Sequence, residues 1–253
     1  MSENNQAAID RFVDAVWLED GLSANTLAAY RRDLAALAQW LQQNAATALD
    51  AAQESHLQAY FAARHSLSKA TSANRRLTVF KRYFRWALRE RIVQVDPTLR
   101  MLAAKQALRV PKTLSEDQVD ALLSAPDVNT SLGLRDKAML ELLYASGLRV
   151  SELVKLKTLH VSLNEGVLRI MGKGSKERLV PFGDMARDSL LSYMQNARST
   201  LLGAKQTDDL FVTASGPKAG TAMSRIMFWS LIKKYAILAG ITAPLSPHTL
   251  RHA

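Results

Sequence analysis

Three short stretches of the sequence place basic residues in arrangements that suit an anionic ligand. In "GLRVSELVKL", Arg149 precedes Glu152 by three residues, so the two side chains can pair on one helical turn. In "GKGSKERLVPF", Lys173 stands between two glycines, and nothing bulky keeps it from a phosphate group. In "LSPHTLRHA", His248 and Arg251 lie three residues apart and would share one face of a helix. Each arrangement also has an ordinary structural explanation.

For Arg149 and Glu152 the ordinary explanation is a surface ion pair, which contributes little to stability. Against this explanation, Arg149 is flanked by Leu148 and Val150, and further apolar residues follow. We therefore expect its guanidinium group to be partly buried and held in one direction.

For Lys173 the ordinary explanation is a solvated hairpin tip, and for His248 it is a structural histidine. Lys176 and Arg178 follow Lys173 closely and add charge that can contact DNA. The glycine spacing around Lys173 does not match a Walker loop. The histidines offer no convincing ligand spacing, so we expect neither a metal ion nor another cofactor.

The net charge of +10 comes from one part of the chain. Residues 62–112 contain 13 lysines and arginines against two acids, a net of +11, which leaves −1 for the remainder. On a helical wheel, the segment "TSANRRLTVFKRYFRWALRERI" has a buried stripe formed by Leu77, Phe80, Phe84 and Leu88. Another side of this helix carries arginines with no acid beside them, at Arg75, Arg82, Arg85 and Arg89. A solvated basic face is the ordinary alternative, and the missing acids favour duplex DNA as the partner.

Helical periodicity runs through residues 1–106, with few glycines or prolines to interrupt it. The first helix has a buried side formed by Ile9, Phe12, Val13, Val16 and Trp17. The basic segment 107–112 reads as a linker. Residues 113–253 are mixed, because helices surround two short β runs, at 167–170 and 179–182, that flank a glycine-rich turn. The sequence therefore predicts a mainly α protein with two domains and a small β-sheet in the second.

Cysteine is absent, which excludes disulfides and thiolate metal sites. The chain has no secretory segment and no apolar run near the roughly 18 residues that a membrane span needs. We therefore expect a soluble, cytoplasmic protein with no membrane partner.

The three basic stretches occur in the order and at the intervals of one known family. Together, "GLRVSELVKL", "GKGSKERLVPF" and "LSPHTLRHA" resemble the catalytic domain of the tyrosine recombinases, which are phage-integrase-like proteins. The stretch "WLEDGLSANTLAAYRRDL" resembles their core-binding domain, most closely that of the bacterial recombinases that resolve chromosome dimers. The resemblance implies a four-helix, SAM-like core-binding domain over 1–106. It also implies a mixed α/β catalytic domain over 113–253 that is truncated inside the His-x-x-Arg helix.

The resemblance also implies a mechanism of DNA strand cleavage and rejoining. A tyrosine attacks the phosphodiester, forms a 3′-phosphotyrosine and releases a 5′-hydroxyl, without a metal or a nucleotide. Arg149 and Arg251 would hold the non-bridging oxygens, and Glu152 would orient Arg149. Lys173 would protonate the leaving 5′-oxygen, and His248 would move a proton near the attacking group.

The nucleophile is the part of this machinery that the sequence does not show. In the family the tyrosine follows the His-x-x-Arg box, whereas every tyrosine here precedes it: Tyr30, Tyr60, Tyr83, Tyr144, Tyr193 and Tyr235. We therefore expect a truncated recombinase that binds DNA without cleaving it. The implied partners are a duplex recombination site, a second related recombinase in a tetramer on two DNA sites, and a DNA translocase. Two alternatives stay open, a non-catalytic DNA-binding regulator and a phage or transposon integrase.

Overall fold

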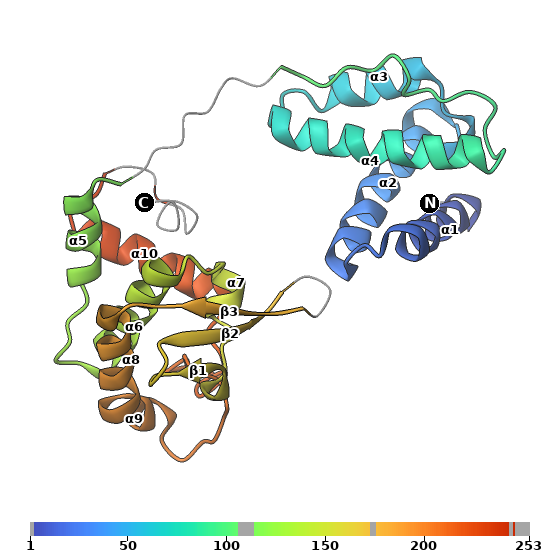
Figure 1. Cartoon of the computed structure of the whole chain (residues 1–253). Coiled ribbons are helices and arrows are strands. Elements are labelled where there is room, and N and C mark those ends of the chain that lie inside the picture. Colours follow the sequence, from blue (N-terminus) through green and yellow to red (C-terminus); the bar gives the residue numbers. More distant parts are fainter. Residues whose placement is uncertain (1–2, 106–113, 173–175, 243–244, 246–253) are drawn as a thin grey trace. The chain divides into compact units, whose positions relative to one another are not determined.

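Two compact units, residues 1–109 and 110–253, make up the chain (Figure 1). The computed structural model describes residues 3–105, 114–172, 176–242 and 245. The linker expected at 107–112 lies outside these described residues. Each unit has a hydrophobic core of its own, as an independently folding domain requires.

The first unit is entirely helical in the part that the structure describes. Its elements are α1 (Glu3–Asp20), α2 (Ala24–Ala45), the 3-10 turn η1 (Leu49–Ala51), α3 (Glu54–Ala63) and α4 (Ala70–Arg89). The hydroxyl of Ser23 accepts the N–H of Thr26 and so caps the start of α2. Helix α2 packs against α1, α3 and α4. The helical unit predicted from periodicity is confirmed.

Aromatic rings fill the core of the first unit. The ring of Phe12 packs edge-on against Tyr83, with 5.4 Å between the centroids, and lies 5.5 Å from Trp86. Two side chains expected in this core are instead exposed, Trp17 by 56% and Leu88 by 41%. In α4 the reason is that Tyr83 and Trp86 turn inward, which rotates the buried face away from Leu88.

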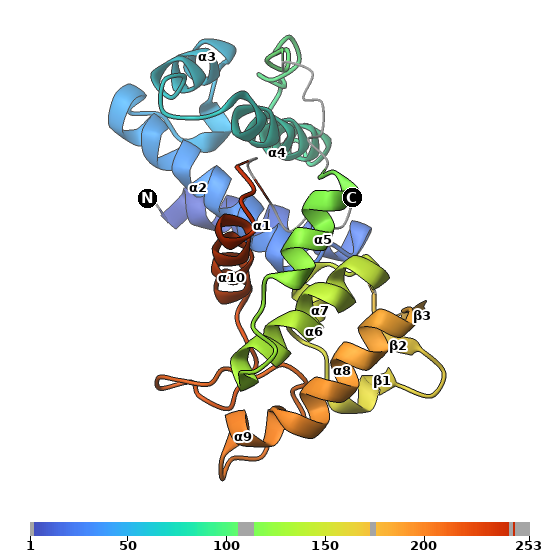
Figure 2. The same cartoon turned by 90° about the vertical axis from the view of Figure 1, so that its left-hand side faces the viewer.

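The second unit combines helices with a small sheet. Its elements are α5 (Glu116–Ser124), α6 (Ser131–Ser146), α7 (Val150–Leu153), the 3-10 turn η2 (Thr158–His160), β1 (Val161–Ser162), β2 (Val167–Met171), β3 (Glu177–Pro181), α8 (Asp184–Asn196), α9 (Arg198–Leu202) and α10 (Arg225–Leu238). Helix α6 is buried on nearly every side and packs mainly against α8 (Figures 1 and 2). The mixed composition predicted for this part of the chain is confirmed.

The sheet is antiparallel, in the order β1-β2-β3. Strands β2 and β3 form a hairpin whose last pair is Met171 with Glu177, so residues 172–176 make the connection. Leu168 and Ile170 point into the core, while Arg169 and Met171 face outward. This alternation fixes which side chains of the hairpin are free to act at the surface.

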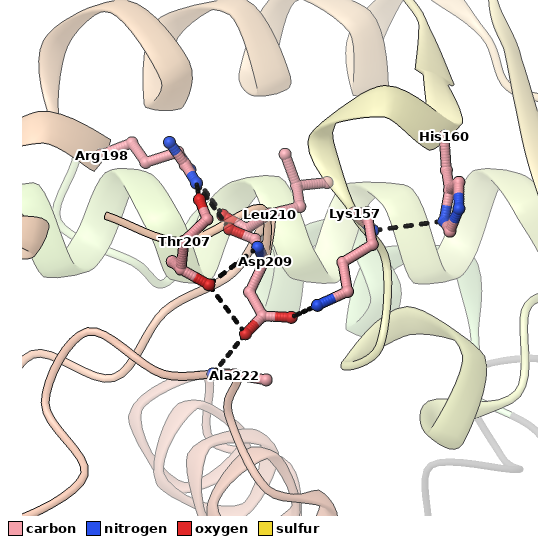
Figure 3. A network of polar contacts seen from close by, with 7 residues as sticks. All are labelled: Lys157, His160, Arg198, Thr207, Asp209, Leu210 and Ala222. Atoms are coloured by element: carbon pink, nitrogen blue, oxygen red, sulfur yellow. Dashed lines mark hydrogen bonds and ion pairs between the residues drawn. The ribbon is translucent and has the colours of Figure 1, made fainter. Parts of the chain in front are cut away.

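A polar network holds the long segment between α9 and α10 against the rest of the unit (Figure 3). The carboxylate of Asp209 accepts from the Lys157 ammonium at 2.5 Å and from the Ala222 N–H at 3.1 Å. The guanidinium of Arg198 donates to the carbonyls of Thr207 and Asp209, both at 2.7 Å. These bonds satisfy backbone groups that no regular element pairs, so they order the segment that leads into α10.

A buried polar contact also joins α6 to α10. The Tyr235 hydroxyl donates to Asp136 at 2.8 Å, and the Arg135 guanidinium contacts the same carboxylate at 2.7 Å. Burial raises the pKa of the Asp136 carboxyl despite the neighbouring Arg135.

Among the described helices, none combines the length and hydrophobicity of a membrane span.

Candidate functional site

The backbone delivers Arg149 at a sharp junction between two helices. Helix α6 ends at Ser146, and Gly147 adopts a left-handed φ of 56° that closes it with an N–H bond to the Leu143 carbonyl. Leu148 is buried, which anchors the junction in the core. Arg149 follows in extended conformation and caps the short helix α7. A residue placed this way has a fixed backbone, and its side chain can extend from the protein surface toward a ligand.

Glu152 fixes Arg149 through two separate contacts. One carboxylate oxygen of Glu152 accepts the Arg149 backbone N–H at 2.8 Å, and the other accepts its guanidinium Nη1 at 3.0 Å. The pairing expected from the three-residue spacing is therefore confirmed. The expected partial burial of Arg149 is wrong, because its side chain is 58% exposed; the buried partner is Glu152, whose side chain is 12% exposed. The junction buries the acid and turns the guanidinium outward.

Arg178 of strand β3 joins the same carboxylate. Its Nη2 donates to Glu152 at 3.0 Å, to the oxygen that also accepts the Arg149 N–H. Arg178 pairs with Ile170 in the hairpin and comes two positions after the end of the connection (172–176) that contains Lys173 in the sequence. Residue spacing along one helix could not predict this contact, because Arg178 lies on a strand more than 20 residues away in the sequence. Glu152 thus ties the Arg149 junction to the hairpin.

The electrostatics of this group favour an anionic Glu152 between two cations. Burial alone raises the pKa of the Glu152 carboxyl. Hydrogen bonds from the Arg149 backbone and from the Arg178 and Arg149 guanidinium groups outweigh burial, so the pKa lies below its ordinary value of 4.5. One carboxylate balances two guanidinium groups, which leaves one net positive charge and several exposed N–H donors. Such a group can bind a phosphate.

Three of the expected site residues, Lys173, His248 and Arg251, lie outside the described residues. Lys176 is described, and its side chain is exposed beside the hairpin connection. No group of acids and histidines that could hold a metal ion occurs within the part of the chain that the structure describes.

The basic face of α4 is a second candidate site, in the first unit. A groove beside it is lined by residues of α1 and α4, among them Glu19, Lys81, Arg82, Arg85 and Arg89. The four arginines expected to share this face all carry exposed or half-exposed side chains. The expectation that no acid pairs with them is wrong, however, because acids arrive from other helices.

Three of the four arginines have carboxylate partners. Arg82 is bound to Asp20 of α1, and Arg89 is bound by both oxygens of Glu19, at 2.5 and 3.1 Å. Arg75 is bound by Asp33 of α2 at 2.8 Å. Arg85 has no polar partner among the described residues. A wheel of α4 alone could not have found these acids, because they lie more than 40 residues away in the sequence.

Comparison with known proteins assigns the two units. The phage integrase family matches residues 112–253, and the N-terminal SAM-like domain of phage integrases matches residues 9–91. The chain belongs to the phage integrase family. The predicted SAM-like and catalytic domains are thereby confirmed as the fold class.

Sequence relatives narrow the type within this family. A protein of Ralstonia nicotianae named tyrosine recombinase XerD is 61% identical over 97% of this chain and 79% of the relative. Proteins with the same name from Proteus mirabilis and Vibrio cholerae are 49% and 46% identical, over 99% and 98% of this chain and 79% and 82% of the relatives. By homology the chain is a tyrosine recombinase of the XerD type, as the sequence resemblance indicated.

Solved structures agree with this fold. A lambda integrase dimer bound to a COC′ core site has a TM-score of 0.72 at 18% identity, over 97% of this chain and 67% of that one. The Tn1549 transposon integrase in complex with circular intermediate DNA has a TM-score of 0.73 at 18% identity, over 97% of this chain and 84% of that one. The low identities show a shared fold, and the sequence relatives favour the XerD type over a phage or transposon integrase.

Proposed function

We propose that this protein binds a duplex recombination site and serves in site-specific strand exchange, in the resolution of chromosome dimers. The observation that carries the proposal is the Glu152 group, in which one buried carboxylate holds Arg149 outward and binds Arg178 of the hairpin. A preorganised guanidinium stabilises charge that develops on a phosphodiester, because it needs little reorganisation during the reaction.

In this proposal Arg149 binds a non-bridging oxygen of the scissile phosphate, and Glu152 orients it. Arg251 binds the phosphate as the second guanidinium, Lys173 protonates the leaving 5′-oxygen, and His248 moves a proton near the attacking group. The XerD names of the relatives and their high identity support these roles. No metal or nucleotide takes part, since the covalent phosphotyrosine keeps the energy of the phosphodiester.

We further propose that none of the tyrosines in residues 1–253 is the nucleophile. Four of their side chains are buried: Tyr60, Tyr83, Tyr193 and Tyr235. Burial raises the pKa of the Tyr193 hydroxyl to about 12, and this hydroxyl is bound to the Leu210 carbonyl. The Tyr30 hydroxyl accepts from Arg82 in the first unit. Tyr144, which is 40% exposed in the last turn of α6, is the tyrosine that an experiment must exclude.

The proposed partners follow from the same relatives. The solved integrases include a dimer bound to a core site and a tetramer bound to a Holliday junction. We propose that this chain likewise acts in a tetramer on two DNA sites, beside a second related recombinase that is XerC-like. A DNA translocase that is FtsK-like is the proposed further partner. A non-catalytic DNA-binding regulator is the alternative function.

A suicide DNA substrate tests the proposal. The polypeptide of residues 1–253 should bind the recombination site and form no covalent adduct on a denaturing gel. An adduct that persists in Tyr144→Phe would show that another tyrosine acts, and an adduct lost in that variant would identify Tyr144. Either adduct overturns the assignment of the nucleophile.

A second experiment separates the recombinase from the regulator. Residues 1–253 are joined to the C-terminal segment of the Ralstonia nicotianae relative, which should restore a phosphotyrosine adduct. Arg149→Ala should then lower cleavage by roughly 10²–10³-fold, as for the loss of one donor to a developing oxyanion. Glu165→Ala, at an exposed acid of the same unit, is the matched control and should cleave normally. Specific DNA binding without any adduct in the joined protein favours the regulator.

A further inference from the structure

The arginines on α4 are held by two different kinds of acid. Asp33, which binds Arg75, has a side chain that is 11% exposed. Asp20 and Glu19, which bind Arg82 and Arg89, are 42% and 47% exposed. A buried carboxylate that loses its cation leaves an unpaired charge in a poorly solvated place, whereas an exposed one is rehydrated. The pairs with α1 can therefore open at little cost, and the pair with Asp33 cannot.

The two exposed acids occupy the same donors that a phosphate would use. Glu19 takes both terminal nitrogens of Arg89, and Glu90 takes its Nε at 3.1 Å. Arg82 donates to Asp20 and, at 3.4 Å, to the hydroxyl of Tyr30. Bidentate contact between a guanidinium and a carboxylate has nearly the geometry of its contact with a phosphate. Carboxylate and phosphate therefore compete for one position on each arginine.

We propose that Glu19 and Asp20 act as internal competitors of DNA phosphates, and so limit the affinity of this helix for duplex DNA of any sequence. The inference rests on the proposed DNA binding of the basic face of α4. Arg85, which has no polar partner among the described residues, makes the first phosphate contact. Arg82 and Arg89 follow only when DNA displaces their acids. Duplex DNA without the recombination site supplies few other contacts to drive that exchange, so it is bound weakly.

Long-range repulsion between these acids and DNA also predicts that neutralising either acid tightens DNA binding. The experiment must therefore separate repulsion from competition. The distinguishing feature is coupling, because a competitor matters only while its arginine is present. Removal of Glu19 should strengthen binding in the wild type and have much less effect once Arg89 is absent. The same relation should hold for Asp20 and Arg82. Repulsion alone gives equal effects in both backgrounds.

The experiment is a pair of double-mutant cycles on the affinity for a labelled duplex of random sequence, measured by fluorescence anisotropy. Glu19→Gln and Asp20→Asn should each tighten binding by about two- to fivefold, the range expected for an exposed ion pair. In the Arg89→Ala and Arg82→Ala backgrounds the gain should fall to that of Asp14→Asn. Asp14 is the matched control, an exposed acid of α1 with no polar partner among the described residues.

The outcomes separate the inference from the function on which it rests. If the wild type binds no duplex at low salt, the proposed DNA binding is wrong. If the wild type binds, and Glu19→Gln raises the affinity equally with and without Arg89, the proposed competition is wrong and the proposed DNA binding stands. Circular dichroism and the thermal midpoint verify folding of each variant. The two cycles are independent, so the Asp20 and Arg82 cycle decides if a Glu19 variant misfolds.

Discussion

The two arginine groups of this molecule differ in the burial of the acids that hold them. In the second unit, Glu152 is nearly buried and binds two guanidinium groups and a backbone N–H at once. In the first unit, Glu19 and Asp20 are close to half exposed and bind one arginine each. Both groups consist of ion pairs, yet only the first is tightly fixed by its surroundings.

The difference follows from what each arginine has to do. A guanidinium that stabilises a reacting phosphate must keep its position through the reaction, and a buried, multiply bonded carboxylate provides that rigidity. A guanidinium that binds the DNA backbone must exchange partners at every association. An exposed carboxylate allows this exchange because water replaces the lost contact. Exposure of the acid thus decides whether an arginine is held in place or can exchange its partner.

The largest effect is expected for Glu152→Ala. The change leaves the Arg149 N–H and two guanidinium groups without their acceptor, so it should lower the free energy of unfolding of the second unit by about 2–3 kcal/mol. Urea denaturation followed by fluorescence measures this loss. The control Glu165→Ala, at an exposed acid, should stay within about 0.5 kcal/mol of the wild type. A loss below 0.5 kcal/mol for Glu152→Ala would remove the distinction between the two groups.

Within the first unit, Arg75→Ala should cost more stability than Arg89→Ala. The former leaves the buried Asp33 carboxylate without its cation, at an expected cost of about 1–2 kcal/mol, and the latter breaks an exposed pair whose two groups water can solvate. Thermal unfolding of the two variants gives the comparison directly. Equal losses would mean that burial of the acid does not decide how firmly an arginine is held.

The same two kinds of arginine should separate in DNA binding. Arg85→Ala should weaken binding several-fold and reduce the salt slope, log Kd against log salt, by about one, because one phosphate contact is lost. Arg75→Ala should leave the slope unchanged, because in the wild type the Arg75 guanidinium stays bound to Asp33 and makes no phosphate contact. Anisotropy titrations over a series of salt concentrations measure both slopes. An unchanged slope for Arg85→Ala would show that this face does not meet the DNA backbone.

The smallest expected effect is the dependence of stability on pH. The pKa of Glu152 is lowered on folding, so its stabilisation is present above its ordinary pKa of 4.5 and is lost as the pH falls through the lower folded value. The stability difference between the wild type and Glu152→Gln should therefore shrink as the pH falls below about 4.5. Glu19→Gln should show a weaker trend, because solvent screens its exposed pair. Urea denaturation along a pH series measures both.

Much of the site was predictable because its signals are local. The three-residue spacing of Arg149 and Glu152 predicted their pairing, and the helical period predicted α1 through α4. The two short β runs around the glycine-rich turn predicted the hairpin that β2 and β3 form. Each of these features depends on residues that are close in sequence, where backbone geometry fixes which side chains meet.

The remaining features depend on tertiary packing. Asp20, Asp33 and Arg178 come from elements that are distant in sequence from their partners, and no periodicity within one helix indicates such neighbours. The outward turn of Arg149 and the rotation of α4 that exposes Leu88 depend on which surface each element packs against. The sequence by itself determined the family, the helices and the positions of the basic residues. Only the tertiary structure decided which acids hold those residues, because a carboxylate selects its partner by distance and burial in space.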